Sequence, residues 1–252
     1  PVDWVRIAAH PAEAEALGPA ISRLHALGYK VGLNIMQISR LESEEIQSTV
    51  AKIASGPAPE ILYFADSLGN MNPARVRQII KDIRTEWDAT LGIHTHDNMG
   101  LALANSIEAI DCGATWVDGT VHGMGRGAGN ASTESLLLQL AQKEPKRFFP
   151  TSIFSLIRTD FEPLYETYSW GSNIYYAYAA SHSIHPTYVQ QMLSTDSYQL
   201  DDVMAALETL AQEEGRSRYC SESLRSAVQS HYTDSSGSWS PSSWVAGRPV
   251  LL

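Results

Sequence analysis

Two histidines separated by one residue, His94 and His96, lie in the segment Gly92 to Gly100. The apolar residues before them indicate a β-strand, and the polar residues after them indicate a loop. Side chains alternate between the faces of a strand, so both imidazoles should point to the same side. Such a pair can bind a metal ion, although two hydrogen-bonded histidines at a strand end would give the same pattern. We predict a metal site because this is the fourth strand of a regular series, and active sites gather at the C-terminal ends of such strands.

Acidic residues follow the neighbouring strands of the series. Asp66 follows the third predicted strand, and Asp118 lies at the end of the fifth, where we expect a structural role for it. In a barrel these side chains would converge on one mouth. Imidazoles combined with carboxylate or amide oxygens suit Mn²⁺, Co²⁺ or Mg²⁺ and leave positions for a substrate. A thiolate zinc site does not fit, because the chain has only two cysteines, which lie far apart in the sequence.

A glycine-rich segment runs from Gly123 to Asn130. It follows a strand and precedes a helix, as a dinucleotide-binding loop does, but no acidic residue ends a following strand about twenty residues later. We therefore interpret it as a loop in which Gly125, Gly127 and Gly129 let the backbone approach a metal or an anionic substrate. Asn130 would then be aimed into the site.

Two further histidines flank the predicted site. His10 follows the first strand and either lines the mouth or has a structural role. His122 comes directly before the glycine-rich loop and could contact the substrate.

The elements that must position these residues alternate regularly. Five predicted strands recur about every 25 to 31 residues, and a helix follows each of them. This pattern fits a (β/α) barrel or a doubly wound parallel sheet, and periodicity alone does not choose between them. The predicted strands cover residues 3–9, 30–38, 61–65, 90–94 and 115–121, and the predicted helices cover residues 13–27, 43–54, 73–87, 101–110 and 133–142.

The composition changes after residue 149. Tyrosines become frequent, and short helices are predicted over residues 201–214 and 222–229. We expect a partial barrel domain over residues 1–149, a helical C-terminal appendage over 150–233, and a linker with the start of a further module over 234–252. The chain begins with proline and ends in an apolar run, so we expect it to be a piece of a longer protein.

The totals restrict the class of protein. The chain has 252 residues, an ordinary apolar share of 44% and a formal net charge of −10. This charge disfavours nucleic acid as a partner. The sequence has no apolar run of about 18 residues and no signal peptide pattern, so we expect a cytoplasmic protein that does not bind a membrane.

Four segments lie at or directly after the ends of predicted strands: residues 5–10, 65–69, 94–98 and 123–134. They resemble successive strand-end motifs of 4-hydroxy-2-oxovalerate aldolases. The same motifs are similar to those of the broader metal-dependent superfamily that includes HMG-CoA lyase and isopropylmalate synthase. The resemblance extends from about residue 4 to residue 142.

The resemblance implies a TIM (β/α)8-type barrel of which this chain holds only the last five βα units. It implies that His94 and His96 are metal ligands and that Asn130 is a third or near-metal ligand. Asp66 would orient a ligand imidazole, as ligating histidines generally require, although it could instead cap the turn that follows it. By its position, Tyr175 is similar to a tyrosine that covers the aldolase substrate.

The function that the resemblance implies is a divalent-metal-dependent aldolase that acts on a 2-oxo acid such as pyruvate and an aldehyde, with Mn²⁺ as the expected ion. The alternatives are a Claisen-type acyl-CoA synthase or lyase of the same superfamily, and a non-catalytic barrel or assembly partner with packing histidines. The chain lacks the family's D-x-x-L-R-D-G-like motif, which supplies a metal ligand, an arginine and a nearby histidine base. We therefore expect the isolated chain to be poorly active. A homo-oligomer or a partner dehydrogenase fits the resemblance.

Overall fold

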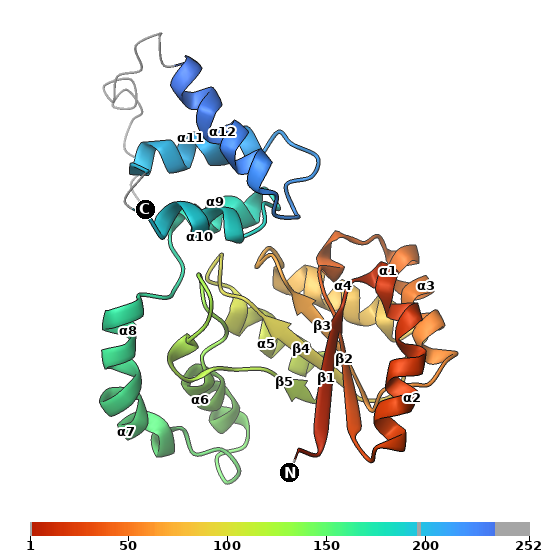
Figure 1. The fold of residues 1–252 in the computed structure, drawn as a ribbon. Coiled ribbons are helices and arrows are strands. Elements are labelled where there is room, and N and C mark those ends of the chain that lie inside the picture. The colour runs from red at the N-terminus through yellow and green to blue at the C-terminus, as the bar shows by residue number, and fades with distance from the viewer. Residues whose placement is uncertain (1, 196–197, 235–252) are drawn as a thin grey trace.

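The computed structural model describes residues 2–195 and 198–234 (Figure 1). Its centre is one sheet of five parallel strands, which are hydrogen-bonded in the same order as they occur in the chain. The strands are β1 (Trp4–Ala9), β2 (Lys30–Ile35), β3 (Ile61–Asp66), β4 (Leu91–Thr95) and β5 (Trp116–Val117). The helices beside the sheet are α1 (Pro11–Ala14), α2 (Gly18–Ala26), α3 (Ser43–Ala54), α4 (Pro73–Ile83), α5 (Ala102–Asp111) and α6 (Thr133–Lys143).

The two faces of the sheet differ in chemistry. One face is apolar and packs against the helices, because every second strand residue contributes to a single buried core: Ala9, Leu33, Ile35, Leu62, Phe64, Leu91 and Ile93. The register places the alternate residues on the opposite face, which we call the inner face: Trp4, Arg6, Asn34, Tyr63 and His94. A doubly wound sheet is covered by helices on both faces, so this asymmetry and the sequential strand order indicate part of a barrel wall.

The sheet curls strongly around its inner face. Three strands separate β1 from β5, yet the ring centroids of Trp4 and Trp116 lie only 5.3 Å apart. Two residues further along β1, Arg6 forms an ion pair with Asp118, which directly follows β5. Side chains from the first and the last strand therefore meet across the concave side, as they do inside a barrel.

Several elements are shorter than the sequence predicts. The predicted strand over residues 115–121 pairs only at Trp116–Val117, and Thr120 then forms a bridge with Ser132. β2 ends at Ile35 because Gln37 adopts a left-handed conformation with φ 53°. The predicted helix over residues 13–27 is divided, since a 3₁₀ turn precedes the new helix that starts at Gly18 with proline in its first turn.

Helices follow one another after residue 149 in the described part of the chain, over the range that we call the appendage. A continuous helical stretch consists of η4 (Pro150–Ile153), α7 (Phe154–Leu156), η5 (Ile157–Phe161) and α8 (Glu162–Tyr168), followed by α9 (Ile174–Ser181), α10 (Thr187–Leu193), α11 (Leu200–Leu210) and α12 (Ser221–Asp234). The last four helices share their own core, to which Ala128 of the glycine-rich loop also belongs. The predicted linker and further module lie almost entirely outside the described residues. None of the described helices has the length and apolar character needed to cross a bilayer.

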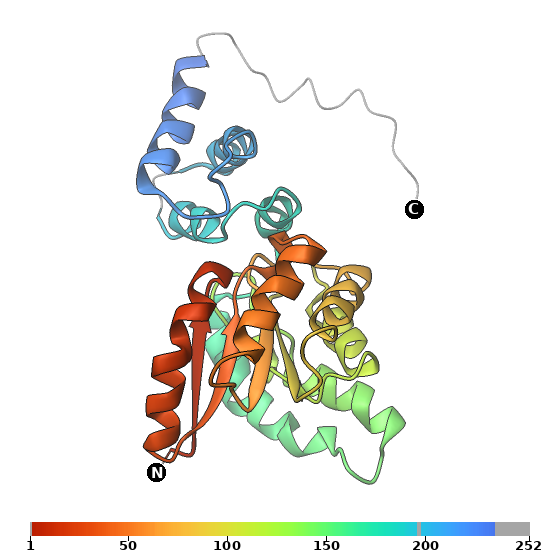
Figure 2. The same ribbon diagram turned by 90° about the vertical axis from the view of Figure 1, so that its right-hand side faces the viewer.

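Helices α9 to α12 of the appendage lie over the C-terminal ends of the strands, whereas α7 and α8 lie beside α6 (Figures 1 and 2). Hydrogen bonds connect the appendage to the loops after β2, β3 and β4. The side chains of Gln37 and Asn70 donate to the Ser217 carbonyl (3.1 Å) and the Ser183 hydroxyl (3.1 Å), and the Ser172 hydroxyl donates to the Asn98 carbonyl (2.7 Å). The loops after three successive strands, β2 to β4, are thus covered by one helical body.

Candidate metal centre

The two histidines lie side by side at the end of β4, as predicted. His94 belongs to the strand, and His96 follows it and forms an antiparallel bridge with Asn130. The ring centroids are 4.8 Å apart, and the ring planes are nearly perpendicular. The alternation of strand side chains therefore brings both imidazoles to the same side, together with the end of the glycine-rich loop.

Hydrogen bonds fix which nitrogen of each ring is available. Nδ1 of His94 lies 2.8 Å from Oδ2 of Asp118, and Nδ1 of His96 lies 2.8 Å from the carbonyl oxygen of Asp66. An ionised carboxylate and a carbonyl can only accept a hydrogen bond, so both Nδ1 atoms carry the proton. The Nε2 lone pairs are then free to bind an ion, which is the arrangement that ligating histidines need.

The electrostatics of the site favour a neutral His96 and an ionised Asp118. Burial, followed by the nearby charge of His94, lowers the pKa of His96 to about 4, so this imidazole is neutral near pH 7. Burial alone would raise the pKa of Asp118, but the hydrogen bond from His94 and the charge of Arg6 hold it below its ordinary value. Asp118 is therefore an ionised partner for His94.

Asn130 presents an unpartnered oxygen. Its Nδ2 donates to the carbonyl of Met124 at 3.1 Å, whereas its Oδ1 is buried without a hydrogen-bond partner. The amide fits only because residue 125 is glycine, since a Cβ there would lie 2.2 Å from Nδ2. A buried, unsatisfied oxygen is costly unless something binds it, and an amide oxygen is a suitable donor for a hard divalent ion. Asn130 therefore fits the ligand role that the resemblance implies.

The other glycines of the loop also have packing reasons. A Cβ on Gly127 would lie 2.9 Å from the hydroxyl oxygen of Tyr176, and a Cβ on Gly129 would lie 2.4 Å from the carbonyl oxygen of Gly123. Both glycines have positive φ angles, which other residues rarely adopt. Contact between the substrate and Gly125, Gly127 or Gly129 stays a prediction.

Asp66 has two roles, one for its carboxylate and one for its backbone carbonyl. Its carboxylate is fully buried on the helix-covered side of the sheet, where it accepts hydrogen bonds from the backbone N–H groups of Asn70 (3.0 Å) and Met71 (3.3 Å). The carboxylate thus caps the turn that follows, and the backbone carbonyl of Asp66 orients His96. Burial raises the pKa of the carboxyl group to about 7, although the backbone hydrogen bonds oppose this shift.

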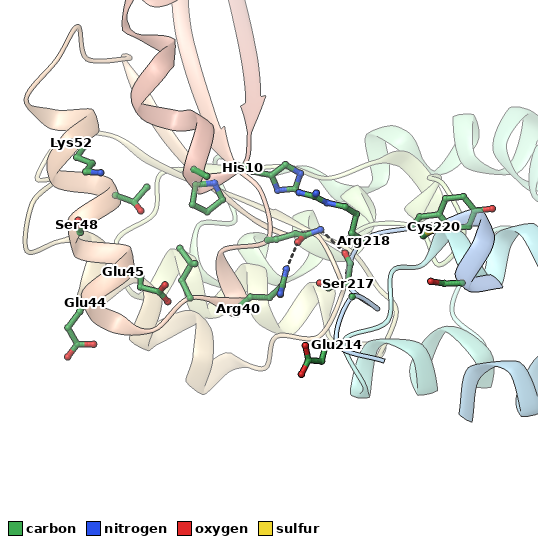
Figure 3. Close-up of a pocket in the computed structure, with 18 residues that line it drawn as sticks. His10, Arg40, Glu44, Glu45, Ser48, Lys52, Glu214, Ser217, Arg218 and Cys220 are labelled. Carbon is green, nitrogen blue, oxygen red and sulfur yellow. Dashed lines mark hydrogen bonds between the residues drawn. The ribbon is translucent and has the colours of Figure 1, made fainter. Parts of the chain in front are cut away.

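Three further predicted site residues line cavities or pack at the appendage core. Half-buried His10 lines a cavity of about 1060 Å³, and Arg218 of the appendage extends toward it (Figure 3). The lining of this cavity includes neither His94 nor His96. Tyr175 packs at the edge of the appendage core.

The third of these residues, His122, has a positive φ angle and directly precedes the glycine-rich loop. Its ring packs edge-on against Tyr165, with ring centroids 5.3 Å apart, and against Trp170 at 6.0 Å. These rings line a second cavity of about 540 Å³, together with Asn130. Substrate roles for His10, Tyr175 and His122 stay predictions.

The donors on this chain are two imidazoles and one amide. Within residues 2–195 and 198–234, no three His, Cys, Asp or Glu side chains gather as a metal site. The sequence interpretation missed the part played by Asp118, for which it expected only a structural role. The sequence feature that could have revealed this role is the charged Arg6 in the otherwise apolar strand β1, because it indicates an acidic partner on the same face.

Comparisons with known proteins find similar sequences. The HMGL-like family matches residues 12–164. The chain is 36% identical over 138 residues to 4-hydroxy-2-oxovalerate aldolase of Carboxydothermus hydrogenoformans, covering 55% of this chain and 41% of the relative. It is 32% identical over 142 residues to oxaloacetate decarboxylase of Mycobacterium tuberculosis, covering 56% and 42%. The chain thus spans about two fifths of the curated relatives it matches.

Solved structures show the same fold. The N-terminal domain of a protein assigned as an aldolase from Bacteroides vulgatus matches with a TM-score of 0.71 and 31% identity, over 81% of this chain and 67% of that one. The carboxyl transferase domain of Rhizobium etli pyruvate carboxylase, in a structure with pyruvate, matches with a TM-score of 0.70 and 15% identity, over 92% and 43%. The predicted partial barrel is confirmed by these matches and by the five parallel strands.

Proposed function

The chain belongs to the HMGL-like family, whose match covers more than half of it, and on this premise we propose that it carries most of the active site of a divalent-metal-dependent aldolase. The reaction would form or cleave a C–C bond next to the keto group of a 2-oxo acid, with an aldehyde as the second substrate. The observation that carries the proposal is the pair of imidazoles with free Nε2 atoms, together with the unpartnered oxygen of Asn130, a residue whose backbone bridges to His96.

The residues present would hold Mn²⁺ in preference to Mg²⁺, because imidazole ligands suit manganese and magnesium prefers oxygen ligands alone. When bound, the ion supplies a Lewis acid that stabilises the enolate of the 2-oxo acid. His94, His96 and Asn130 would bind it, and Asp118 with the Asp66 carbonyl would keep the two rings oriented. The appendage covers the strand ends and would limit the access of water to the enolate.

The donor set on this chain is incomplete for such a site. A hard divalent ion normally has an anionic oxygen ligand, and both carboxylates near the imidazoles are already used to cap a turn or to orient His94. We propose that a carboxylate and the proton-transferring base come from polypeptide outside this chain. The isolated chain should therefore bind Mn²⁺ weakly and turn over slowly. We likewise propose, and only from the family resemblance, that the full-length protein associates with a partner dehydrogenase or with a second copy of itself.

Decarboxylation of a 2-oxo dicarboxylic acid is a second candidate. A relative at 32% identity is an oxaloacetate decarboxylase, and loss of CO₂ from such a substrate also leaves a pyruvate enolate. The two activities therefore need the same residues here and differ in the group that leaves. Pyruvate release from a 4-hydroxy-2-oxo acid and from oxaloacetate, measured on the full-length protein with Mn²⁺, distinguishes them.

Titration with Mn²⁺, Co²⁺ and Mg²⁺ tests the site itself. We expect one Mn²⁺ ion per chain, with its affinity lowered at least about tenfold by His94→Ala or His96→Ala, since each variant removes a ligand. His25→Ala is the matched control, because His25 lies on α2 and pairs with Glu60 outside the site. Equal binding by all three variants would show that the two histidines only pack, as in a non-catalytic barrel.

A further inference from the structure

A continuous row of contacts crosses the inner face and ends on His94. The Tyr63 ring lies against Gly92 so closely that a Cβ on this glycine would be 2.4 Å from the ring. The guanidinium carbon of Arg6 lies 4.8 Å from the centre of the same ring. Arg6 then donates to Oδ2 of Asp118 at 2.6 Å, and the same Oδ2 accepts from Nδ1 of His94 at 2.8 Å. The row therefore starts on β4, passes over β3, β1 and the end of β5, and returns to β4.

We propose that Gly92, Tyr63, Arg6 and Asp118, which we call the inner-face row, position His94 for the metal ion. The proposal rests on the metal site of the proposed function and adds positioning residues to it. None of the four residues is a metal ligand. Their effect on the ion passes through the direction of one imidazole.

The geometry explains why Arg6 matters despite its exposure. Its side chain is 41% exposed, and an exposed ion pair by itself contributes little to stability. However, a single oxygen of Asp118 serves both Arg6 and His94, so a shift of the guanidinium moves the acceptor of the imidazole. The Tyr63 ring supports the flat face of the guanidinium, which a lysine ammonium could not use in the same way. Arg6 is thus a link between the first and the last strand of the sheet.

The alternative is that the inner-face row merely keeps the sheet curled. In that case its variants would lower stability and leave metal affinity and the state of the His94 ring unchanged. Isosteric and conservative substitutions separate the two roles. Asp118→Asn keeps an oxygen that can accept from His94, whereas Asp118→Ala removes it. Arg6→Lys keeps the charge, whereas Arg6→Gln removes it.

The experiment combines Mn²⁺ titration with the NMR signal of the Nδ1 proton of His94 in the metal-free chain. We expect Asp118→Ala to weaken Mn²⁺ binding about 10- to 100-fold, as losses of outer partners of ligating histidines do, and to abolish the slowly exchanging Nδ1 signal. Arg6→Gln should weaken binding less, Arg6→Lys least, and Asp118→Asn should retain the signal. Gly92→Ala should weaken binding although it lies at the far end of the row, because Tyr63 must move.

Arg77→Gln is the matched control, since it breaks an ion pair of 2.8 Å with Glu108 on the helices and leaves the inner face intact. Wild-type affinity in Asp118→Ala and Arg6→Gln, in a chain that loses Mn²⁺ on His94→Ala, would overturn the inference and leave the proposed function standing. A wild-type chain that binds no Mn²⁺ would instead contradict the proposed function. An Nδ1 signal of equal protection in wild type, Arg6→Gln and Asp118→Ala would contradict the row in either case.

Discussion

Gly125→Ala is the sharpest single test of the candidate site, because it displaces Asn130 without removing it. The new Cβ would lie 2.2 Å from Nδ2 and 3.1 Å from Cγ of Asn130, so the amide must leave its place. The hydrogen bond from Nδ2 to the Met124 carbonyl breaks, and Oδ1 leaves its buried position. Overpacking costs about 1 to 3 kcal/mol and the lost hydrogen bond about 1 kcal/mol, so we expect a loss of about 2 to 4 kcal/mol in the free energy of unfolding.

The effect on metal binding should be visible in the same measurement. Urea unfolding is followed with and without Mn²⁺ at a concentration of about 100 times the wild-type Kd, where binding adds about 2.7 kcal/mol to wild-type stability. If displacement of Asn130 weakens binding about 100-fold, the same concentration adds only about 0.4 kcal/mol to the variant. The variant therefore loses stability in the absence of the ion and most of the stabilisation by the ion.

Gly215→Ala is the matched control, since its Cβ would point into open space and its φ angle is not positive. It should leave both the stability and the response to Mn²⁺ unchanged within about 0.5 kcal/mol. If Gly125→Ala kept the full 2.7 kcal/mol response, Asn130 would not be a ligand, and the reasoning from its unpartnered oxygen would fail.

Two further predictions concern buried residues outside the donor set. The folded-state pKa of Asp66 is raised to about 7, so its protonated form stabilises the fold below pH 4 and this contribution is lost as the pH rises through 7. The stability of Asp66→Asn minus that of wild type, measured by urea unfolding with a chelator present, should thus increase from pH 4 to pH 8 by at most about 4 kcal/mol. A difference that does not change with pH would contradict the raised pKa of Asp66. Phe64 is fully buried on the helix-covered face, so Phe64→Ala should cost about 3 to 5 kcal/mol in thermal or urea unfolding, and a loss below about 1 kcal/mol would contradict the assigned core.

Much of the fold follows from patterns that are local in the sequence. The stretch from Val31 to Met36, with Asn34 as its one polar residue, predicts burial in a parallel sheet, and α4 starts at Pro73, where the proline indicates a helix start. The single residue between His94 and His96 predicts that both rings share a side. Each of these features depends on a period of two residues or on one local propensity, so no tertiary information is needed.

The rest depends on register and on distant contacts. Asp66 lies on the helix-covered face because Ala65, and not Asp66, is the register partner of His94. The sequence does not contain that register, so it could not decide between the carboxylate and the carbonyl of Asp66 as the partner of an imidazole. The contact between Arg6 and Asp118 joins residues 112 positions apart, and although a charged Arg6 in an apolar strand indicates an acidic partner, the sequence does not say which one. The early end of β2 depends on one left-handed residue, Gln37, which is not a residue type typical of that conformation.

The two faces of the sheet make stability and metal affinity separable properties. Phe64 and Tyr63 are adjacent in β3, but one belongs to the core under the helices and the other to the inner-face row. Phe64→Ala should therefore lower stability and leave the Nδ1 signal of His94 intact, because its side chain does not touch the row. Tyr63→Leu should disturb that signal at a smaller cost in stability, since it keeps a buried apolar side chain but loses the ring under Arg6. If both substitutions changed stability and the His94 signal in the same proportion, the inner face would be only the second side of the core.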